Sequence, residues 1–170
     1  LMVCNWLYPN HIKIGHNVEL YSDEYYRIYR RYLSHLLDIR SNHFCLMGIE
    51  ITPIRDENEK IVDFDLSLLE KHLQIADEMG FPVLYGAYIA HWNHWTDDNL
   101  YLLWDKSVAV TEREAYRQLA LYLARLREMI ELNGWEERFI QPLVDEPQVN
   151  NERPYRILAA IYRKFIPYIP

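Results

Sequence analysis

Two adjacent carboxylates, Asp145 and Glu146, are the residues of this sequence best suited to chemistry. They follow an apolar run, Phe139–Val144, that predicts a short buried strand, and Pro147 ends it. Neighbouring side chains of a strand point to opposite faces, so both acids can face one ligand only if the backbone turns there. Adjacent carboxylates in a partly dry cleft repel each other, and one of them is expected to keep its proton. The pair could therefore supply an acid beside a base.

The same two acids also have a purely structural interpretation. A polar loop, Gln148–Arg153, follows them and leads to a predicted helix that opens at Pro154 and is closed by Pro167. Acidic residues before a helix often serve only to cap it or to favour its positive end. Their position directly after an apolar strand, with His and Trp residues near other strand ends, favours the functional interpretation.

The elements that must position these acids alternate between strand and helix. Apolar runs bounded by turn residues predict strands at Met2–Tyr8, His43–Ile51, Phe81–Ala90 and Phe139–Val144. Apolar residues at three- and four-residue steps predict helices from Ser22 to Leu37, from Asp65 to Met79, from Thr111 to Gly134 and from Pro154 to Phe165. The predicted N-caps are Ser22, Asp65 and Thr111, the last in a capping box with Glu114. The ten residues after Asn10, the segment Thr52–Asp63 and the long stretch His91–Val110 are predicted to be loops.

Strand followed by helix, repeated four times, is typical of a parallel sheet with helical crossovers. Half of the 170 residues are hydrophobic, so residues 1–170 are expected to form a single domain. A complete eight-stranded barrel needs around 200 residues or more. The predicted fold class is therefore α/β, a partial (β/α) barrel of TIM-barrel type within a larger (β/α)8 domain, and a small open parallel sheet is the main competitor.

In either fold, ligands bind beyond the carboxyl ends of the strands. The residues predicted to gather there are Tyr8, Glu50, Tyr88, His91, Trp92, Asp145 and Glu146. The long stretch after the third strand adds Trp95 and Trp104, and its Trp rings could stack on the apolar face of a sugar. Packing within that stretch is an equally good account of each Trp. A carbohydrate is the predicted ligand.

Several other functions fit the sequence poorly. His91 and His94 lie near Asp97 and Asp98, but their spacing fits no zinc pattern, so no metal site is predicted. With only 5 glycines, a phosphate-binding loop is absent, and no cofactor is expected. A net charge of -7 argues against nucleic acid, and no apolar run reaches the roughly 18 residues of a membrane span.

The tail of the chain resembles a known family. An apolar strand, Asp145-Glu146-Pro147, a polar loop, Tyr155 and a helix ending at Ile166-Pro167 resemble the catalytic domain of glycoside hydrolase family 123 and its bacterial relatives. The resemblance implies a (β/α)8 barrel that hydrolyses a β-linked N-acetylhexosamine, preferably N-acetylgalactosamine. It also implies an exported protein whose remaining barrel strands come from the parent chain.

The resemblance also implies roles for the two acids. The acetamido oxygen of the sugar attacks its own anomeric carbon, so no enzyme carboxylate becomes the nucleophile, and adjacent carboxylates can suffice. Glu146 would be the general acid that protonates the leaving oxygen. Asp145 would orient and polarise the acetamido nitrogen.

Two alternatives remain open on the sequence. One pairs Glu50 with Glu146 as nucleophile and acid of a two-carboxylate retaining glycosidase, which requires a carboxyl separation of about 5 Å. The other is a non-catalytic carbohydrate-binding or scaffold domain that uses only Trp92, Trp95 and Trp104.

Overall fold

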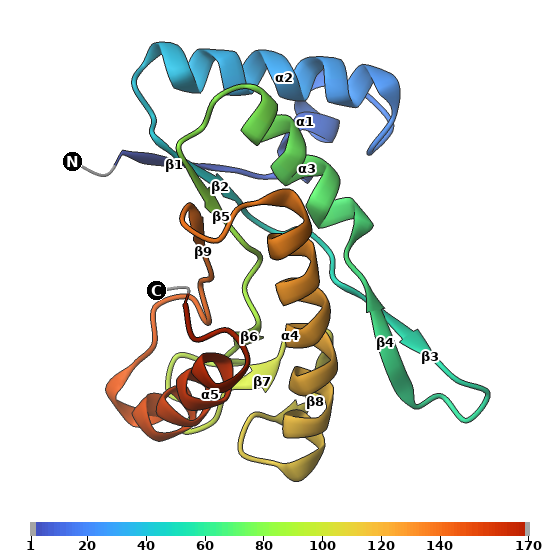
Figure 1. Cartoon of the computed structure of the whole chain (residues 1–170), viewed down its shortest axis with the longest axis vertical. Helices are drawn as coiled ribbons and strands as arrows, with labels where there is room; N and C mark the ends of the chain where they lie inside the picture. Colours follow the sequence, from blue (N-terminus) through green and yellow to red (C-terminus); the bar gives the residue numbers. More distant parts are fainter. Residues whose placement is uncertain (1–2, 169–170) are drawn as a thin grey trace. The chain divides into compact units, whose positions relative to one another are not determined.

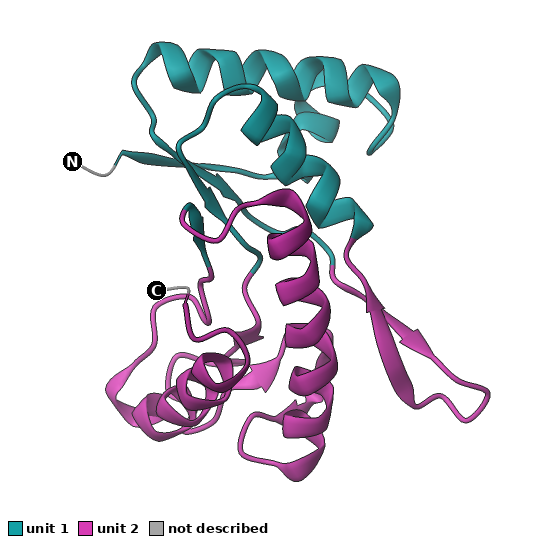
Figure 2. Ribbon diagram, in the orientation of Figure 1, with its two compact units in different colours: residues 1–50, 67–87, 138–140 teal, residues 51–66, 88–137, 141–170 magenta. Residues whose placement is uncertain are grey.

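The computed structural model describes residues 3–168 as a mixed α/β chain with two compact units (Figures 1 and 2). The first unit contains Leu1–Glu50, Ser67–Ala87 and Arg138–Ile140. The second contains Ile51–Leu66, Tyr88–Glu137 and Gln141–Pro170. Each unit is described by itself below.

The first unit is built on a four-stranded parallel sheet. Its strands are β1 (Cys4–Leu7), β2 (His43–Leu46), β5 (Val83–Tyr85) and β9 (Phe139–Ile140), in the order β1-β2-β5-β9. The four predicted strands and their parallel pairing are confirmed, although each is shorter than predicted, and Met2 lies outside the described residues. The order of the strands in the sheet is the same as their order along the chain. Among residues 3–168 the strands do not close into a barrel.

Three helices belong to this unit: α1 (Pro9–His16), α2 (Asp23–Asp38) and α3 (Ser67–Glu78). The loop predicted after Asn10 is wrong, because Pro9 opens a helix instead of ending the strand region. Proline is well tolerated at the first helical position, where its missing N–H would have had no partner. The predicted N-cap Asp65 is also wrong, since it is the last residue of a strand and α3 begins two residues later.

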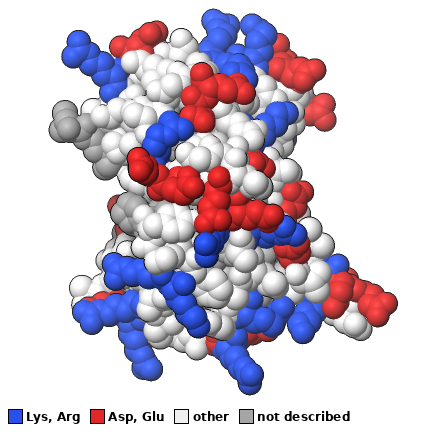
Figure 3. Space-filling model, viewed as in Figure 1, with Lys and Arg blue, Asp and Glu red and all other residues white. Residues whose placement is uncertain are grey.

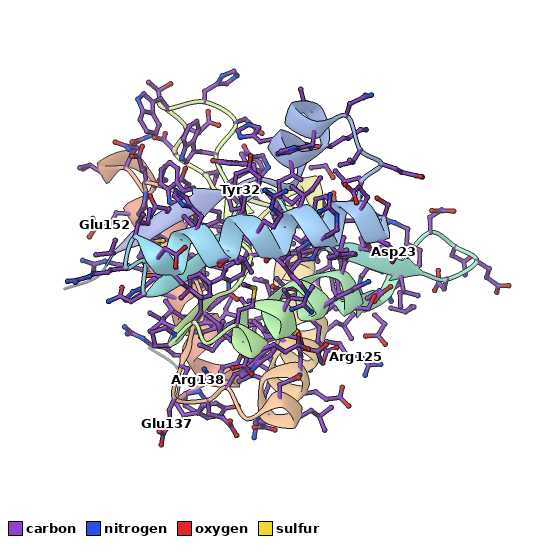
Figure 4. The ribbon with its side chains drawn as sticks, turned by 90° about the horizontal axis from the view of Figure 1, so that it is seen from above. Asp23, Tyr32, Arg125, Glu137, Arg138 and Glu152 are labelled. Carbon is purple, nitrogen blue, oxygen red and sulfur yellow. The ribbon has the colours of Figure 1, made fainter. Side chains whose placement is uncertain are left out.

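Helix α2 starts and packs as its sequence predicts. The Ser22 hydroxyl accepts a hydrogen bond from the Tyr25 N–H at 3.2 Å, and Asp23 places a carboxylate in the first turn, at the right-hand end of the helix in Figure 4. Tyr25, Tyr29 and Leu33 are completely buried. Their burial on one face accounts for the apolar stripe in the sequence.

A buried histidine lies under this face of α2. His72 of α3 is fully buried, its Nδ1 donates to the Leu68 carbonyl at 2.8 Å, and its Nε2 lies 3.1 Å from the Tyr25 hydroxyl. The Leu68 carbonyl can only accept, so Nδ1 carries the proton and Nε2 accepts from Tyr25. Burial, with a smaller effect of the Lys71 charge, lowers the pKa of His72 from 6.5 to about 4.

We expect this histidine to make the fold sensitive to acid. The unfolded chain binds a proton at its ordinary pKa, so the stabilising effect is complete above pH 6.5 and is lost as the pH falls towards 4. The shift corresponds to about 3 kcal/mol of unfolding free energy. Urea unfolding at several pH values measures it, and His72→Gln should flatten this part of the profile. An unchanged pH profile in the variant would contradict the assignment.

The second unit contains two antiparallel sheets and two long helices. The hairpin pairs β3 (Thr52–Arg55) with β4 (Ile61–Asp65), and the other sheet has the order β6-β7-β8, with β6 (Ala90–His91), β7 (Tyr101–Leu102) and β8 (Asp105–Ala109). The helices are α4 (Arg113–Asn133), the 3-10 turn η1 (Val149–Asn151) and α5 (Glu152–Phe165). Two predicted loops are therefore wrong, because Thr52–Asp63 forms most of a hairpin and His91–Val110 contains most of a small sheet.

Helix α4 ends as predicted but begins differently. Gly134 takes φ +67° at its C-cap, the left-handed conformation that glycine adopts without strain. The predicted capping box is wrong, because the N-cap is Glu112 and its carboxylate accepts from the Ala109 N–H at 3.2 Å. The Glu112 side chain therefore supports the turn that leaves β8 and makes no capping hydrogen bond to the helix.

The surface of each unit mixes both signs of charge on the face seen in Figure 3. On α4, Arg125 pairs with Asp63 at 2.5 Å and with Glu128 at 2.8 Å. Within residues 3–168, none of the helices combines the length and the apolar character that crossing a membrane requires.

Candidate functional site

The segment that leads to the two acids is fixed to β6. The Leu143 carbonyl accepts from the Ile89 N–H at 3.1 Å and from the Ala90 N–H at 2.9 Å, and Val144 forms a parallel bridge with Ala90. Leu143 and Val144 are buried. The second unit therefore holds the backbone just before Asp145 in a strand-like position.

The backbone turns at the two acids, as the sequence requires. Asp145 and Glu146 form a bend, and Glu146 has φ +42°, in the left-handed region. This conformation costs a non-glycine residue about 1 kcal/mol or more, and a following proline restricts it further. The Gln148 side-chain amide donates to the Glu146 carbonyl at 2.9 Å and supports the turn. The predicted turn is confirmed.

Asp145 is half-buried and held from two sides. Its Oδ1 accepts from the Tyr88 hydroxyl at 3.1 Å, and its backbone carbonyl accepts from the Trp92 indole N–H at 3.0 Å. Glu146 is exposed to solvent. The structure thus brings together Tyr88, Trp92 and Asp145 from segments more than 50 residues apart, with Glu146 next in the chain.

The loop after β6 extends this cluster outward. The rings of Trp92 and Trp95 lie 4.5 Å apart, at 51° to each other, and Trp95 is 52% exposed. The Asp97 carboxylate accepts from the backbone N–H groups of Asn93 and His94 at 2.9 and 2.8 Å. The Asp97 carbonyl accepts from the Asn150 side chain at 2.5 Å. The loop is therefore tied both to itself and to the segment that follows Glu146.

His91 is the last residue of β6, directly before this loop. Its Nδ1 lies 3.1 Å from the Trp92 carbonyl, which can only accept, so Nδ1 carries the proton. Its Nε2 is buried and has no hydrogen-bond partner within residues 3–168. Burial lowers the pKa of His91. A neutral imidazole is thus enclosed at the base of the loop.

Trp104 has a different environment from the other two tryptophans. Its ring packs 4.8 Å from both Phe64 and Tyr122, and its indole N–H donates to Gln118 at 2.9 Å. These contacts match the packing interpretation. Among the described residues, the hydrogen bond and ring contacts given above for Trp104 involve neither Asp145 nor Glu146.

Tyr8 and Glu50 belong to the first unit and are described there alone. Tyr8 precedes α1, and its ring lies 4.8 Å from that of His11. Glu50 is exposed beyond the end of β2. Burial, followed by the Glu50 charge, raises the pKa of the Tyr21 hydroxyl.

Sequence reasoning missed the residues that hold the loop. Asp97 was considered only as a metal ligand, yet its carboxylate closes a local turn, a common use of aspartate in loops. Among residues 3–168, His, Cys, Asp and Glu side chains form no group of three that could hold a metal ion. No sequence pattern indicated the roles of Gln148 and Asn150, because their side chains donate to backbone carbonyls.

Comparison with known protein families gives a match over most of the chain. The family model described as the glycoside hydrolase 123 catalytic domain matches residues 6–167. The chain belongs to the glycoside hydrolase 123 family. No curated protein matches the sequence.

The glycoside hydrolase 123 match covers nearly the whole chain, from within β1 to just beyond α5. The match therefore includes many residues that precede the Asp145-Glu146-Pro147 motif. Family membership identifies the chain as a glycosidase domain, which confirms both the predicted family and the predicted enzyme class. The match includes residues of both units.

Proposed function

We propose that this glycosidase domain hydrolyses a β-linked N-acetylhexosamine, such as N-acetylgalactosamine, with retention of configuration and with assistance from the substrate. The observation that carries the proposal is the bend at Asp145 and Glu146. It holds Asp145 half-buried, with the carboxylate accepting from the Tyr88 hydroxyl and the backbone carbonyl accepting from the Trp92 indole, and it presents the Glu146 carboxylate to solvent. Two carboxylates with such different environments suit two different roles.

In the first step, the acetamido carbonyl oxygen of the sugar attacks the anomeric carbon. The bond to the leaving oxygen breaks, and Glu146 gives its proton to that oxygen. Asp145 accepts a hydrogen bond from the acetamido N–H, which increases the electron density on the attacking oxygen. The Tyr88 hydroxyl, 3.1 Å from Asp145 Oδ1, keeps that carboxylate oriented.

In the second step, water attacks the same carbon from the face that the leaving group occupied. Glu146, now a carboxylate, takes a proton from the water, and the cyclised acetamido group reopens. Two inversions at one carbon give net retention. His91, whose Nδ1 lies 3.1 Å from the Trp92 carbonyl, is proposed as a further substrate-binding residue.

We also propose that the parallel sheet is a segment of a (β/α)8 barrel. The strands β1, β2, β5 and β9 lie in the sheet in the same order as in the sequence. This order supports a barrel over a doubly wound sheet, in which the strand order reverses at one point. On this proposal residues 1–170 act as one domain, and the strands that complete the barrel come from the parent chain.

A panel of chromogenic glycosides tests the proposed substrate. We expect hydrolysis of β-N-acetylgalactosaminides or β-N-acetylglucosaminides, and at least 100-fold lower kcat/KM for the matching β-hexosides, because these lack the internal nucleophile. Comparable rates on both series would instead favour an enzyme nucleophile, such as Glu50 in the two-carboxylate alternative. Sugar binding without turnover, retained after loss of both Asp145 and Glu146, would favour the non-catalytic alternative.

A further inference from the structure

Trp95 is an exposed aromatic side chain on a loop that is held in place. Its indole is 52% exposed, although burial of such a large apolar side chain is usually favourable. Its ring contacts that of Trp92 at 4.5 Å, and Asp97 fixes the loop through two backbone hydrogen bonds. An aromatic face presented to water on an ordered loop is suited to a ligand with a flat apolar surface.

Trp95 is connected to the bend that carries the two acids, and this connection indicates which part of the substrate Trp95 contacts. Trp92, its neighbour, donates to the Asp145 carbonyl, so the Trp pair lies against the bend that carries both acids. Within this bend Asp145 is half-buried, whereas Glu146 is exposed, as Trp95 is. The proposed general acid, Glu146, and the Trp95 ring are therefore both open to solvent.

We propose that Trp95 forms the binding subsite for the leaving group, where it stacks on the apolar face of a pyranose ring. The preferred substrate is then an oligosaccharide or glycoconjugate whose second sugar contacts Trp95. His94 and Asp98 are exposed polar residues on the same loop. This inference rests on the proposed function, because it requires Glu146 to act at the leaving oxygen.

Two substrates that share one sugar but differ in the leaving group test the proposal. An N-acetylgalactosaminyl β-fluoride has no ring to stack, whereas a β-linked N-acetylgalactosaminyl disaccharide has one. We expect Trp95→Ala to lower kcat/KM for the disaccharide by about tenfold, mainly through KM, as for loss of one stacking contact. The same variant should hydrolyse the fluoride at the wild-type rate, which also shows that it is folded.

Two further variants complete the comparison. Trp95→Phe keeps an aromatic ring and should restore most of the activity on the disaccharide. Trp6→Ala removes a tryptophan of the first unit that is 61% exposed and should leave both substrates unaffected. An unchanged disaccharide rate in Trp95→Ala, or an equal loss on both substrates, would overturn the leaving-group subsite alone. A wild-type protein that hydrolyses neither substrate would overturn the proposed function and this inference with it.

Discussion

Glu146→Gln is expected to lower kcat by about 10²–10⁴ on glycosides with poor leaving groups, the usual contribution of general acid catalysis. The amide keeps the shape of the side chain and its turn conformation but has no proton to give to the leaving oxygen. Glycosides of acidic phenols need less help from an acid, so their rates should fall much less in the same variant. The measurement is kcat/KM for a series of aryl glycosides whose leaving groups differ in pKa.

A matched control for this variant is available in the next helix. Glu152 is also exposed, lies six residues further along the chain and pairs with Arg156 on the surface of α5. Glu152→Gln should retain wild-type activity on every leaving group. If Glu146→Gln behaves in the same way, Glu146 is not the acid.

Asp145→Asn is expected to cause a second large loss, about 10²–10³ in kcat. The variant amide keeps one oxygen for the Tyr88 hydroxyl, but it loses the charge that polarises the acetamido N–H. That interaction strengthens as positive charge develops on the acetamido group, so kcat should fall more than KM rises. Steady-state kinetics on one N-acetylhexosaminide measures both constants.

Asp38→Asn provides the comparison for this charge removal. Asp38 is an exposed residue at the end of α2, so its loss should leave kcat and KM unchanged. An Asp145→Asn protein whose kinetics match those of Asp38→Asn would show that Asp145 has no role in polarising the substrate. Far-ultraviolet circular dichroism of both variants checks that the fold is retained.

The strands of the first unit and the turn at the acids were predictable from local signals. Apolar runs that end at turn residues located β1, β2, β5 and β9, and an apolar run followed by Asp, Glu and Pro located the turn. Helix α1 was missed because Pro9 was taken as the end of an element. A proline ends one segment or begins a helix with equal ease, and only the packing of Ile12 into the core decides between them.

The small sheet of the second unit could not be predicted from its sequence. Strands β6 and β7 have two residues each, too few to show alternation, and the register shifts between Tyr101 and Leu102. The pairing of Ala90 with Leu102 is what makes them strands. Tertiary contact, not local propensity, determines structure in such short segments.

The contacts around Asp145 depend on the fold in the same way. Tyr88 reaches Asp145 across 57 positions and Trp92 across 53, and no local pattern identifies such pairs. The sequence did place all three residues at the ends of neighbouring strands. It could not separate Trp95, which is exposed, from Trp104, whose ring packs on Phe64 and Tyr122, because both occupy one long segment between a strand and a helix.

The most direct test of a single acid pair acting on an acetamido sugar is the binding of a stable thiazoline analogue of the cyclised intermediate. Isothermal titration calorimetry would compare the unaltered protein with Asp145→Asn. We expect binding to the unaltered protein and at least 100-fold weaker binding to the variant, since transition-state and intermediate analogues exploit such contacts strongly. Equal affinity of the two proteins for the thiazoline would contradict the proposed role of Asp145 and the substrate-assisted mechanism built on it.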